Sequence, residues 1–336
     1  MSGYQANLTG LPTVSVVIAA FAMERWNDLQ EAVASVRAQT IRVLETIVVI
    51  DHNATLLDRT QREFPDVIVI PNVGSRGASG ARNSGVAASH GAVVAFLDDD
   101  AVASANWLES LLRHFVDPDV VGVGGSMIPL WPGSRPRWFP HEFDWAVGAS
   151  YRGMPEKAER VRNVWGCNMA IPRQVFNRIG GFREDIGKVG RRSRPEDTDL
   201  CLRAVAAQPE GTWIYEPTGV AGHRVTLKRT TFGYFLYRCL HEGWGKAVLV
   251  AFNGTRESTS AEWLYTHRVL PRGIARGLRD TVRGDISGGM RSIAIAIGFS
   301  LTVVGFLSGR AAETIHRAYP AAGPANPPKR ESKRTK

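Results

Sequence analysis

The feature that most limits the possible fold is an alternation of strand-like and helix-like patterns in the first third of the chain. Residues 14–21 form a continuous apolar run, as expected for a strand covered on both faces. Leu29, Val33 and Val36 then recur at helical spacing, before a β-branched run at residues 46–50. Strands that alternate with helices need crossover connections, which favour a mainly parallel sheet. The sequence therefore predicts an α/β fold, with a Rossmann-like sheet covered by helices on both faces.

Three adjacent aspartates end the fourth predicted strand. The third strand is expected at residues 67–70, and the fourth, at 92–97, runs directly into Asp98, Asp99 and Asp100. Open α/β sheets bind ligands at the carboxyl ends of their strands. Neighbouring carboxylates repel one another unless a positive group lies among them. A hard cation such as Mg²⁺ or Mn²⁺, shared with phosphate oxygens, would explain the cluster, and a solvated acidic turn that caps the next helix is the alternative.

The side-chain directions in this triplet follow from the expected strand. If the alternation of an extended strand continues, Asp98 and Asp100 share one direction and Asp99 points the other way. Asp98 and Asp100 are therefore the predicted metal ligands.

Two other segments can contact a nucleotide. Asp51 follows the strand at 46–50, where a carboxylate can accept from a ribose hydroxyl or a base N–H, although an ordinary turn aspartate explains it equally well. The glycine-rich stretch 72–85 enters a helix and carries Arg76 and Arg82, either of which can bind a diphosphate. Close packing of that helix on the sheet is the alternative role for the glycines. The chain lacks a dinucleotide-binding fingerprint after the first strand and lacks a P-loop motif.

A second acidic pair, Glu196 and Asp197, begins a predicted helix far downstream. Acidic residues are common in a first helical turn because of the helix dipole. Beside a metal–diphosphate site, however, such a carboxylate becomes a candidate general base that deprotonates an acceptor hydroxyl.

These motifs, taken in order, resemble the nucleotide-sugar-binding half of family-2 inverting glycosyltransferases with the GT-A fold. The resemblance covers about residues 12–225, which we expect to form one domain. It depends on Asn-x-Gly at 72–74, Gly-Ala-Arg-Asn-x-Gly at 80–85, Phe-Leu-Asp-Asp-Asp at 96–100, Gly-Cys-Asn-Met-Ala at 166–170, Gly-Gly-Phe at 180–182 and Pro-Glu-Asp-Thr-Asp-Leu-Cys-Leu-Arg at 195–203. It implies a nucleoside-diphosphate-sugar donor, with a UDP-sugar favoured, and a divalent metal, Mg²⁺ or Mn²⁺.

The resemblance also implies roles for residues that bind the donor. Phe21 and Asp51 are expected to line the nucleobase pocket, and Arg82 is expected to face the diphosphate. Asp98 and Asp99 complete the predicted donor-binding set.

For the metal and the chemistry, the resemblance implies a second set of roles. Asp98 and Asp100 form the metal-binding D-x-D, and His223 lies where some members of the family place a late histidine near the metal. His223 could equally well be an ordinary surface histidine without a functional role. Asp197 is the expected base, with Glu196 as the alternative.

The last third of the chain is basic and helical in pattern. The formal net charge of +9 requires an acidic partner, and four arginines fall on one face of a predicted helix at 272–283. An apolar run follows at 293–307, shorter than the ~20 residues that span a bilayer. It can be a short transmembrane helix, an in-plane anchor or a core helix, and the basic face beside it favours association with an anionic membrane surface. We expect a membrane-associating region at 226–310 and a disordered basic tail at 311–336.

These patterns predict a location and an acceptor. The first eleven residues lack the pattern of a secretory signal, and the three cysteines suggest a reducing compartment. We therefore expect the protein at the cytoplasmic face of the cell membrane, held peripherally or by one short helix. A cell-envelope glycan or a lipid-linked molecule is the expected acceptor, and nucleic acid is not expected as a partner because acidic clusters repel it.

Three other functions fit parts of the sequence. A polyprenyl-phosphate hexose synthase differs only in its acceptor. A sugar nucleotidyltransferase shares the aspartates and the glycine-rich loop, but it does not need the downstream acidic pair. A non-enzymatic basic scaffold explains the charge and leaves the strand-end aspartates unexplained.

Overall fold

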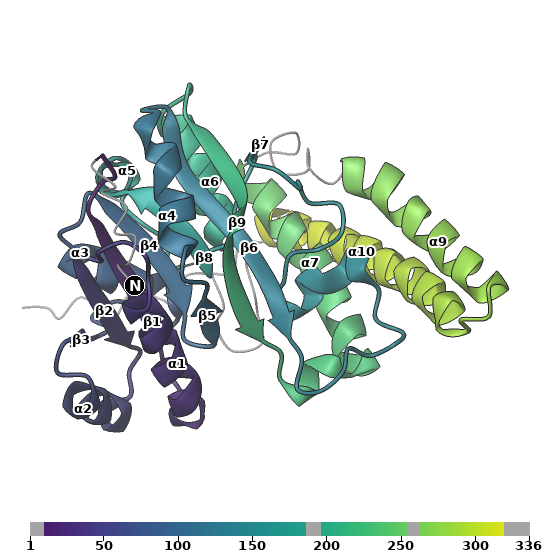
Figure 1. Ribbon diagram of the computed structural model, residues 1–336. Coiled ribbons are helices and arrows are strands. Elements are labelled where there is room, and N and C mark those ends of the chain that lie inside the picture. The colour runs from purple at the N-terminus through teal and green to yellow at the C-terminus, as the bar shows by residue number, and fades with distance from the viewer. Residues whose placement is uncertain (1–9, 186–195, 254–262, 319–336) are drawn as a thin grey trace, which may run out of the picture.

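One sheet of nine strands organises the first two thirds of the molecule (Figure 1). The computed structural model describes residues 10–185, 196–253 and 263–318. In chain order the strands are β1 Val14–Ala20, β2 Glu45–Ile50, β3 Ile68–Pro71, β4 Val93–Asp98, β5 Ala101–Ala103, β6 Val120–Leu130, β7 Glu159–Val161, β8 Asn168–Pro172 and β9 Thr212–Arg224. The four strands predicted from the apolar runs are β1 to β4.

The sheet is parallel in its first half and mixed in its second. The spatial order is β3-β2-β1-β4-β8-β6-β9-β5, and β7 pairs with β9. Strands β3, β2, β1 and β4 are parallel, as predicted. Beyond β4, strand β8 is antiparallel to both of its neighbours, β6 and β9 are parallel, and β5 and β7 run antiparallel to β9. The α/β fold class is confirmed, but the parallel order does not extend across the whole sheet.

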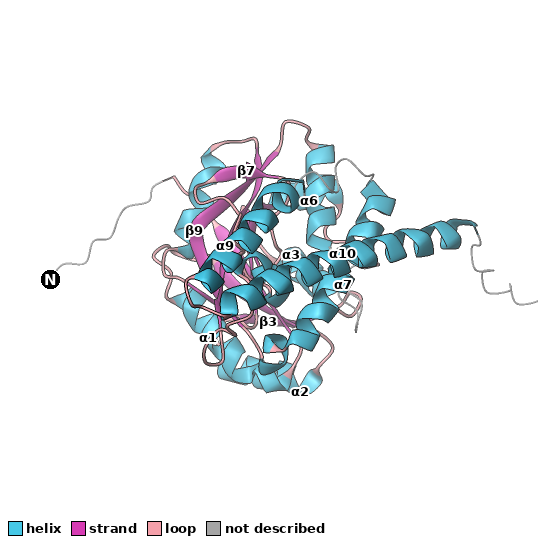
Figure 2. Ribbon diagram, turned by 90° about the vertical axis from the view of Figure 1, so that its right-hand side faces the viewer, coloured by secondary structure: helices cyan, strands magenta, loops and turns pink. Residues whose placement is uncertain are grey.

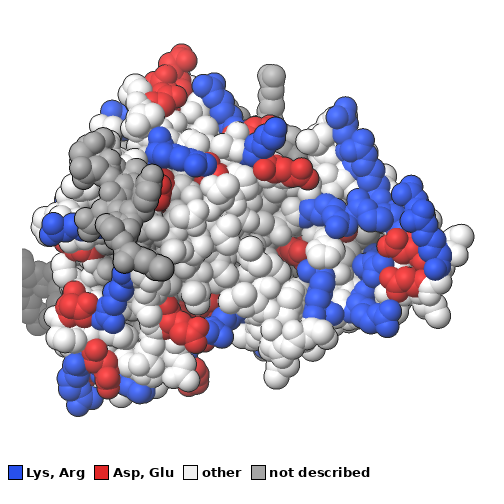
Figure 3. All heavy atoms as spheres, in the orientation of Figure 1, with Lys and Arg blue, Asp and Glu red and all other residues white. Residues whose placement is uncertain are grey.

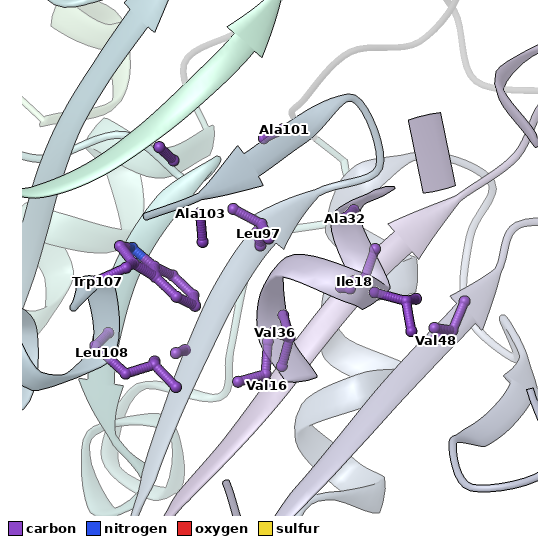
Figure 4. Packing of buried hydrophobic residues seen from close by; sticks show 14 of the residues in the cluster. Val16, Ile18, Ala32, Val36, Val48, Leu97, Ala101, Ala103, Trp107 and Leu108 are labelled. Atoms are coloured by element: carbon purple, nitrogen blue, oxygen red, sulfur yellow. The ribbon is translucent and has the colours of Figure 1, made fainter. Parts of the chain in front are cut away.

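Helices cover both faces of the sheet, as predicted. Helices α1, α2 and α4 pack on one face through a core that includes Ile18, Val36 and Trp107, part of which is shown in Figure 4. Helices α3, α5 and α6 pack on the other face around Phe96 and Trp213. The six helices are α1 Trp26–Arg37, α2 Ala54–Glu63, α3 Ala78–Ala88, α4 Trp107–Leu112, α5 Arg173–Ile179 and α6 Glu196–Ala207. Because both faces are covered, the apolar runs of the strands are continuous rather than alternating.

After β9 the chain is helical. Helix α7 Phe232–Asn253 and the α9–α10 hairpin, formed by α9 Leu270–Val282 and α10 Ser287–Ala318, pack together beside the sheet domain (Figures 1 and 2). Five shorter helical segments complete the described chain: η1 Met23–Arg25, η2 Arg113–Val116, η3 His141–Val147, η4 Leu227–Thr230 and η5 Tyr265–Val269. A third core of aromatic and aliphatic side chains joins η3, α7 and the hairpin. Helix α10 continues past the predicted boundary at residue 310, so the tail predicted from 311 is helical as far as Ala318, and the rest lies outside the described residues.

Glycines allow these helices to approach closely. A Cβ at Gly277 of α9 would overlap Ser292 and the Gly288 backbone of α10. A Cβ at Gly305 of α10 would overlap the backbone carbonyl of Leu240 in α7. Small residues at helix interfaces are a common packing device of membrane helices. The glycines that weaken the helices by propensity therefore serve the packing between them.

The hairpin also carries an apolar outer surface. The segment Ser287–Ala312 of α10 is 26 residues long and apolar enough to cross a membrane, and 33% of its most apolar window is buried in the molecule. Five large apolar side chains around the turn of the hairpin are exposed: Leu278, Val282, Ile286, Met290 and Ile293. The apolar segment is thus longer than the run at 293–307 suggested.

Candidate active site

The acidic triplet lies at the carboxyl end of β4, but its side chains do not alternate as expected. Strand β4 ends at Asp98, and Asp99 and Asp100 form a turn before β5. Asp98 contacts Arg82, whereas Asp99 and Asp100 both contact Arg25. The predicted alternation is wrong beyond Asp98, because the backbone leaves the extended conformation there.

Arg25 supplies the positive charge that three adjacent carboxylates need. Its Nη1 lies 2.8 Å from Asp99 Oδ1 and 3.0 Å from Asp100 Oδ2. Both aspartates are buried, and burial raises the pKa of Asp99 to about 7 against the opposing effect of Arg25. Among the described residues, Asp99 Oδ2 has no hydrogen-bond partner. Asp98, by contrast, keeps 33% of its side chain exposed and can reach a ligand.

His223 on β9 lies beside Asp100. Residues 101 and 223 pair between β5 and β9, and His223 Nε2 lies 3.5 Å from Asp100 Oδ1. Arg229 Nη1 also lies 3.3 Å from that nitrogen, so Nε2 accepts and the ring is neutral. Burial lowers the pKa of His223, and Asp100 offsets this only in part. The structure therefore places a neutral imidazole nitrogen and a carboxylate oxygen side by side.

This pair of atoms fits a divalent cation. Two ligand atoms that share an octahedral ion at ~2.1 Å lie roughly 3 Å apart, close to the separation of Nε2 and Oδ1. Imidazole and carboxylate are both ligands of first-row divalent metals. No three His, Cys, Asp or Glu side chains converge on one point in the part of the chain that is described, so phosphate oxygens or water would have to complete the coordination. The contact between Arg229 and His223 would also have to be replaced.

Arg82 connects the strand end to the downstream acidic pair. It is buried on α3, with Nη2 3.0 Å from Asp98 Oδ1 and Nη1 3.5 Å from Glu196 Oε1. Burial opposes the charged form, but Asp98 and Glu196 raise the pKa of Arg82 above its ordinary value. Gly166 leaves room for the guanidinium, because a Cβ there would lie 2.8 Å from Nη1. Arg82 is therefore a fixed cation between two predicted functional groups.

Glu196 and Asp197 lie together at the start of α6. Asp197 Oδ1 accepts from the Thr198 backbone N–H at 2.8 Å, and Oδ2 accepts from the Gly166 N–H at 3.3 Å. Burial raises the pKa of Asp197 against these two hydrogen bonds. Burial and the neighbouring Asp197 raise the pKa of Glu196 to about 7, with Arg82 opposing. Carboxyl groups with raised pKa values are suited to proton transfer near neutral pH.

The residues predicted to bind the nucleobase lie at the ends of β1 and β2. The ring of Phe21 is 54% exposed and lies beneath the Arg25 guanidinium, at 5.3 Å. Asp51 accepts from Asn72 Nδ2 at 2.7 Å and from the Gly77 N–H at 2.9 Å. Phe21 is thus available for stacking, whereas Asp51 ties the glycine-rich loop to the sheet.

The glycine-rich segment mainly serves packing. A Cβ at Gly85 would overlap Val17 of β1, and a Cβ at Gly80 would overlap the Ser75 carbonyl. Arg76 is exposed on the loop, whereas Arg82 is buried on the helix. Of the two arginines considered for the diphosphate, Arg82 is the one the structure places beside the aspartates.

Two residues of this site were not predicted. The sequence indicated that a cation must lie among the aspartates, but nothing in it singled out Arg25, which follows β1 in the short helix η1. Arg229 was not predicted either, because it reaches His223 from η4, just after β9.

Comparison with known proteins shows which family the chain resembles. The family model described as glycosyl transferase family 2 matches residues 15–180. The glucosyl-dolichyl phosphate glucuronosyltransferase of Haloferax volcanii is 36% identical over 241 residues, which cover 70% of this chain and 77% of that protein. The pre-mycofactocin glycosyltransferase of Mycobacterium tuberculosis is 31% identical over 188 residues, or 55% of this chain and 38% of that protein.

A solved structure shares the fold. The mannosyltransferase of Pyrobaculum calidifontis, in complex with GDP-Man and Mn²⁺, superposes with a TM-score of 0.55. The match covers 94% of this chain and 89% of that one, at 17% identity. At this identity the likeness concerns the fold alone.

Proposed function

This chain belongs to glycosyltransferase family 2 and is a glycosyltransferase, and on that premise we propose that it transfers a sugar, with inversion, from a nucleoside-diphosphate donor to a hydroxyl of a lipid-linked acceptor. A UDP-sugar is the favoured donor, and Mg²⁺ or Mn²⁺ is the proposed cofactor. The mannosyltransferase of the same fold holds GDP-Man and Mn²⁺, which supports a metal in this class of site.

The observation that carries the proposal is the position of Arg82. Its guanidinium contacts Asp98, at the strand end where the donor is expected, and Glu196, next to the proposed base. One rigid cation therefore links the groups expected at the leaving group and at the acceptor. Such fixed charges stabilise developing charge without reorganisation during the reaction.

In the proposed mechanism each side chain has a separate task. Phe21 stacks on the nucleobase, and Arg82 faces the diphosphate once the donor lies against Asp98. Asp197, held by two backbone N–H groups, accepts the proton of the acceptor hydroxyl as its oxygen attacks the anomeric carbon. Attack opposite the departing nucleotide inverts that carbon. Holding both reactants in place supplies much of the acceleration.

Asp100 and His223 would hold the metal, and Asp98, the third predicted ligand, would join them only by turning away from Arg82. The 3.5 Å separation of Asp100 Oδ1 and His223 Nε2 and the partial exposure of Asp98 support this assignment. With the ion bound, the negative charge of the nucleoside-diphosphate leaving group is neutralised.

The acceptor and the location are inferred from the relatives and from the helical region. The relative from Haloferax volcanii is named for a dolichyl-phosphate-linked sugar. The apolar α10 and the exposed turn of the hairpin support association with the membrane in which such a substrate resides. The cytoplasmic face of that membrane is the proposed location. A polyprenyl-phosphate hexose synthase is less well supported, because an ionised phosphate acceptor needs no base such as Asp197.

The proposal is tested by a donor screen. Binding of UDP-, GDP- and dTDP-sugars should be measured by calorimetry, with and without Mn²⁺, on the wild type and on Asp100→Ala. We expect Mn²⁺-dependent binding of one donor class, which the folded variant loses. Metal-dependent binding that survives in the variant would refute the assigned metal site, and no binding of any nucleotide-sugar would refute the function.

A further inference from the structure

One cavity of the described structure has a lining separate from the proposed active site. It has a volume of about 440 Å³ and opens between the α9–α10 hairpin and the segment 135–152. Its described lining includes none of the residues assigned above to the donor, the metal or the base. A volume of this size is typical of small-ligand sites. The proposed reaction gives it no role.

Arginines dominate the lining. Five of them share the lining with three carboxylates, and a fourth carboxylate, Asp144, pairs with Arg135 behind it, which leaves a formal excess of one positive charge. Figure 3 shows Lys and Arg side chains, with some Asp and Glu among them, gathered over the side of the molecule where Figure 1 draws the hairpin. The arginines are Arg135, Arg137, Arg152, Arg276 and Arg291.

Acidic side chains hold several of these guanidinium groups in place. One of the acids is buried, and two lie in the hairpin. Glu142 is buried and contacts Arg276 at 2.8 Å and Arg152 at 3.7 Å. Arg291 contacts Asp280 and Asp285, each at 2.9 Å. The wall of the cavity is therefore ordered before any ligand arrives, which lowers the entropic cost of binding.

Arg137, at the mouth of the cavity, has N–H groups that can donate hydrogen bonds to a ligand. The side chain of Arg137 is 82% exposed, and its Nη2 makes only a long contact, 3.4 Å, with Asp285. A guanidinium carries five N–H donors in a planar fork that matches the oxygens of a phosphate. Arg135 already donates to Asp144 and to the Phe139 carbonyl, and the four other arginines around one basic cavity favour a phosphate over a carboxylate or a neutral ligand.

The residues around the cavity favour a lipid headgroup as the molecule that carries this phosphate. Asp285 and Ser287 line the cavity, and Ile286 between them is 78% exposed. Val282, at the end of α9, is 89% exposed. An apolar surface thus borders the mouth, so that contact with a bilayer would bring lipid headgroups to the arginines.

We propose that this cavity binds the phosphate headgroup of a membrane lipid. The inference rests on the membrane association proposed above, and it adds a specific lipid site to it. The bound lipid holds the hairpin at the bilayer surface. Its test uses no nucleotide-sugar and no acceptor, so its failure leaves the transferase function untouched.

The test uses short-chain phosphatidic acid below its micelle concentration, so that no charged surface is present. Binding is measured by calorimetry and compared with inorganic phosphate and glycerol 3-phosphate. We expect the lipid to bind at least about 10-fold more tightly than inorganic phosphate. Equal affinities would mean that the ligand is a free phosphate, which contradicts the lipid assignment, as would the absence of lipid binding.

Two matched pairs of substitutions locate the site. Arg137→Gln with Arg152→Gln should weaken lipid binding at least about 10-fold, because charged hydrogen bonds are lost. Arg272→Gln with Arg283→Gln removes the same charge from exposed positions of the hairpin region outside the cavity lining and should change binding by less than about 2-fold. Equal losses in the two pairs would overturn the proposal.

A conservative pair covers the case in which the glutamine pair does not fold. Arg137→Lys with Arg152→Lys keeps both charges but loses the planar forks, so it should also weaken binding clearly. Full binding in this folded pair would show that only net charge matters, which again contradicts the site.

Discussion

Arg25 and Arg82 determine how three adjacent aspartates are accommodated at one strand end. Arg25 contacts the buried Asp99 and Asp100, and Arg82 contacts Asp98 from α3. Without these cations, the burial of several carboxylates would force protonation. Two arginines against three aspartates leave a formal excess of one negative charge at the strand end when all three are ionised, and the diphosphate of the proposed donor would meet cations as well as acids.

The acidic pair at the start of α6 leads us to predict how the activity depends on pH. The pKa of Glu196 is raised to about 7 and that of Asp197 is raised as well, in both cases mainly by burial. A base works only when deprotonated, so a raised pKa removes activity at low pH. We expect kcat/KM to rise as the pH increases through about 7, with the apparent pKa belonging to the pair. A pH–rate profile from 5 to 9 checks this, and a flat profile over that range would contradict a carboxyl base with a raised pKa.

The individual residues were only partly predictable. The positions of Asp98 at a strand end and Asp197 at a helix start could be predicted, because the hydrophobic pattern marks both boundaries, whereas their proposed roles come from the family resemblance. The residues that contact them could not be predicted, because Arg25, Arg82 and Gly166 reach the site from separate elements. Asp51 shows the same limit, since its partners Asn72 and Gly77 depend on how the loop folds back.

Among the elements, the junction of α7 and α10 is the least tolerant of added volume. Gly305 lies against the Leu240 backbone, and that helix carbonyl cannot move without disturbing α7. Gly305→Ala gains about 1 kcal/mol of helix propensity but overpacks the interface. We expect a net loss of roughly 1–2 kcal/mol in the free energy of unfolding, seen as a lower Tm in thermal melts.

Gly233→Ala is the matched control for this prediction. Gly233 lies at the start of α7, the helix that Gly305 of α10 packs against, and apart from its own chain neighbours and helix backbone no described atom lies within 4 Å of the position its Cβ would take. This change should leave the Tm unaltered or raise it. If both variants melt alike, close packing of α7 on α10 is not what Gly305 provides.

The helices and strands of the first half of the chain were easier to predict from the sequence than those of the second half. Strands β1 to β4 are continuous apolar runs separated by amphipathic helices, and this local pattern gives both their type and their parallel order. The pairing of β8 between β4 and β6 connects residues about 75 and 45 positions apart, which no local pattern records. Helix α10 was underestimated for a different reason, because Arg291 and Arg310 interrupt the apolar run without ending the helix.

At the scale of the whole molecule, we propose that the sheet domain carries out the transfer and that the helical region attaches the protein to the membrane. The hairpin lies at the side of the molecule away from β1 to β3 (Figure 1). We expect Val282→Glu with Ile286→Glu to reduce co-sedimentation with anionic liposomes at least about 10-fold, because two exposed apolar contacts are lost and negative charge is added. Since both side chains are exposed, the fold should not change.

Val116→Glu provides the control for membrane binding. Val116 is as exposed as Ile286 but lies in η2 on the sheet domain. It should leave sedimentation nearly unchanged. Wild-type protein that ignores anionic vesicles, or an equal loss in Val116→Glu, would contradict the assignment of the hairpin as the membrane-binding element.

The central claim is that Asp197 removes the proton of the acceptor in a transfer from a nucleotide-sugar. It is tested most directly by measuring kcat and the donor Kd of Asp197→Asn together. Asparagine keeps the shape of the side chain but cannot accept a proton at neutral pH. For Asp197→Asn we predict a fall in kcat of at least ~10²-fold with nearly unchanged donor affinity. For Glu196→Gln we predict a smaller fall in kcat. Normal turnover in Asp197→Asn, with the donor bound as in the wild type, would contradict it.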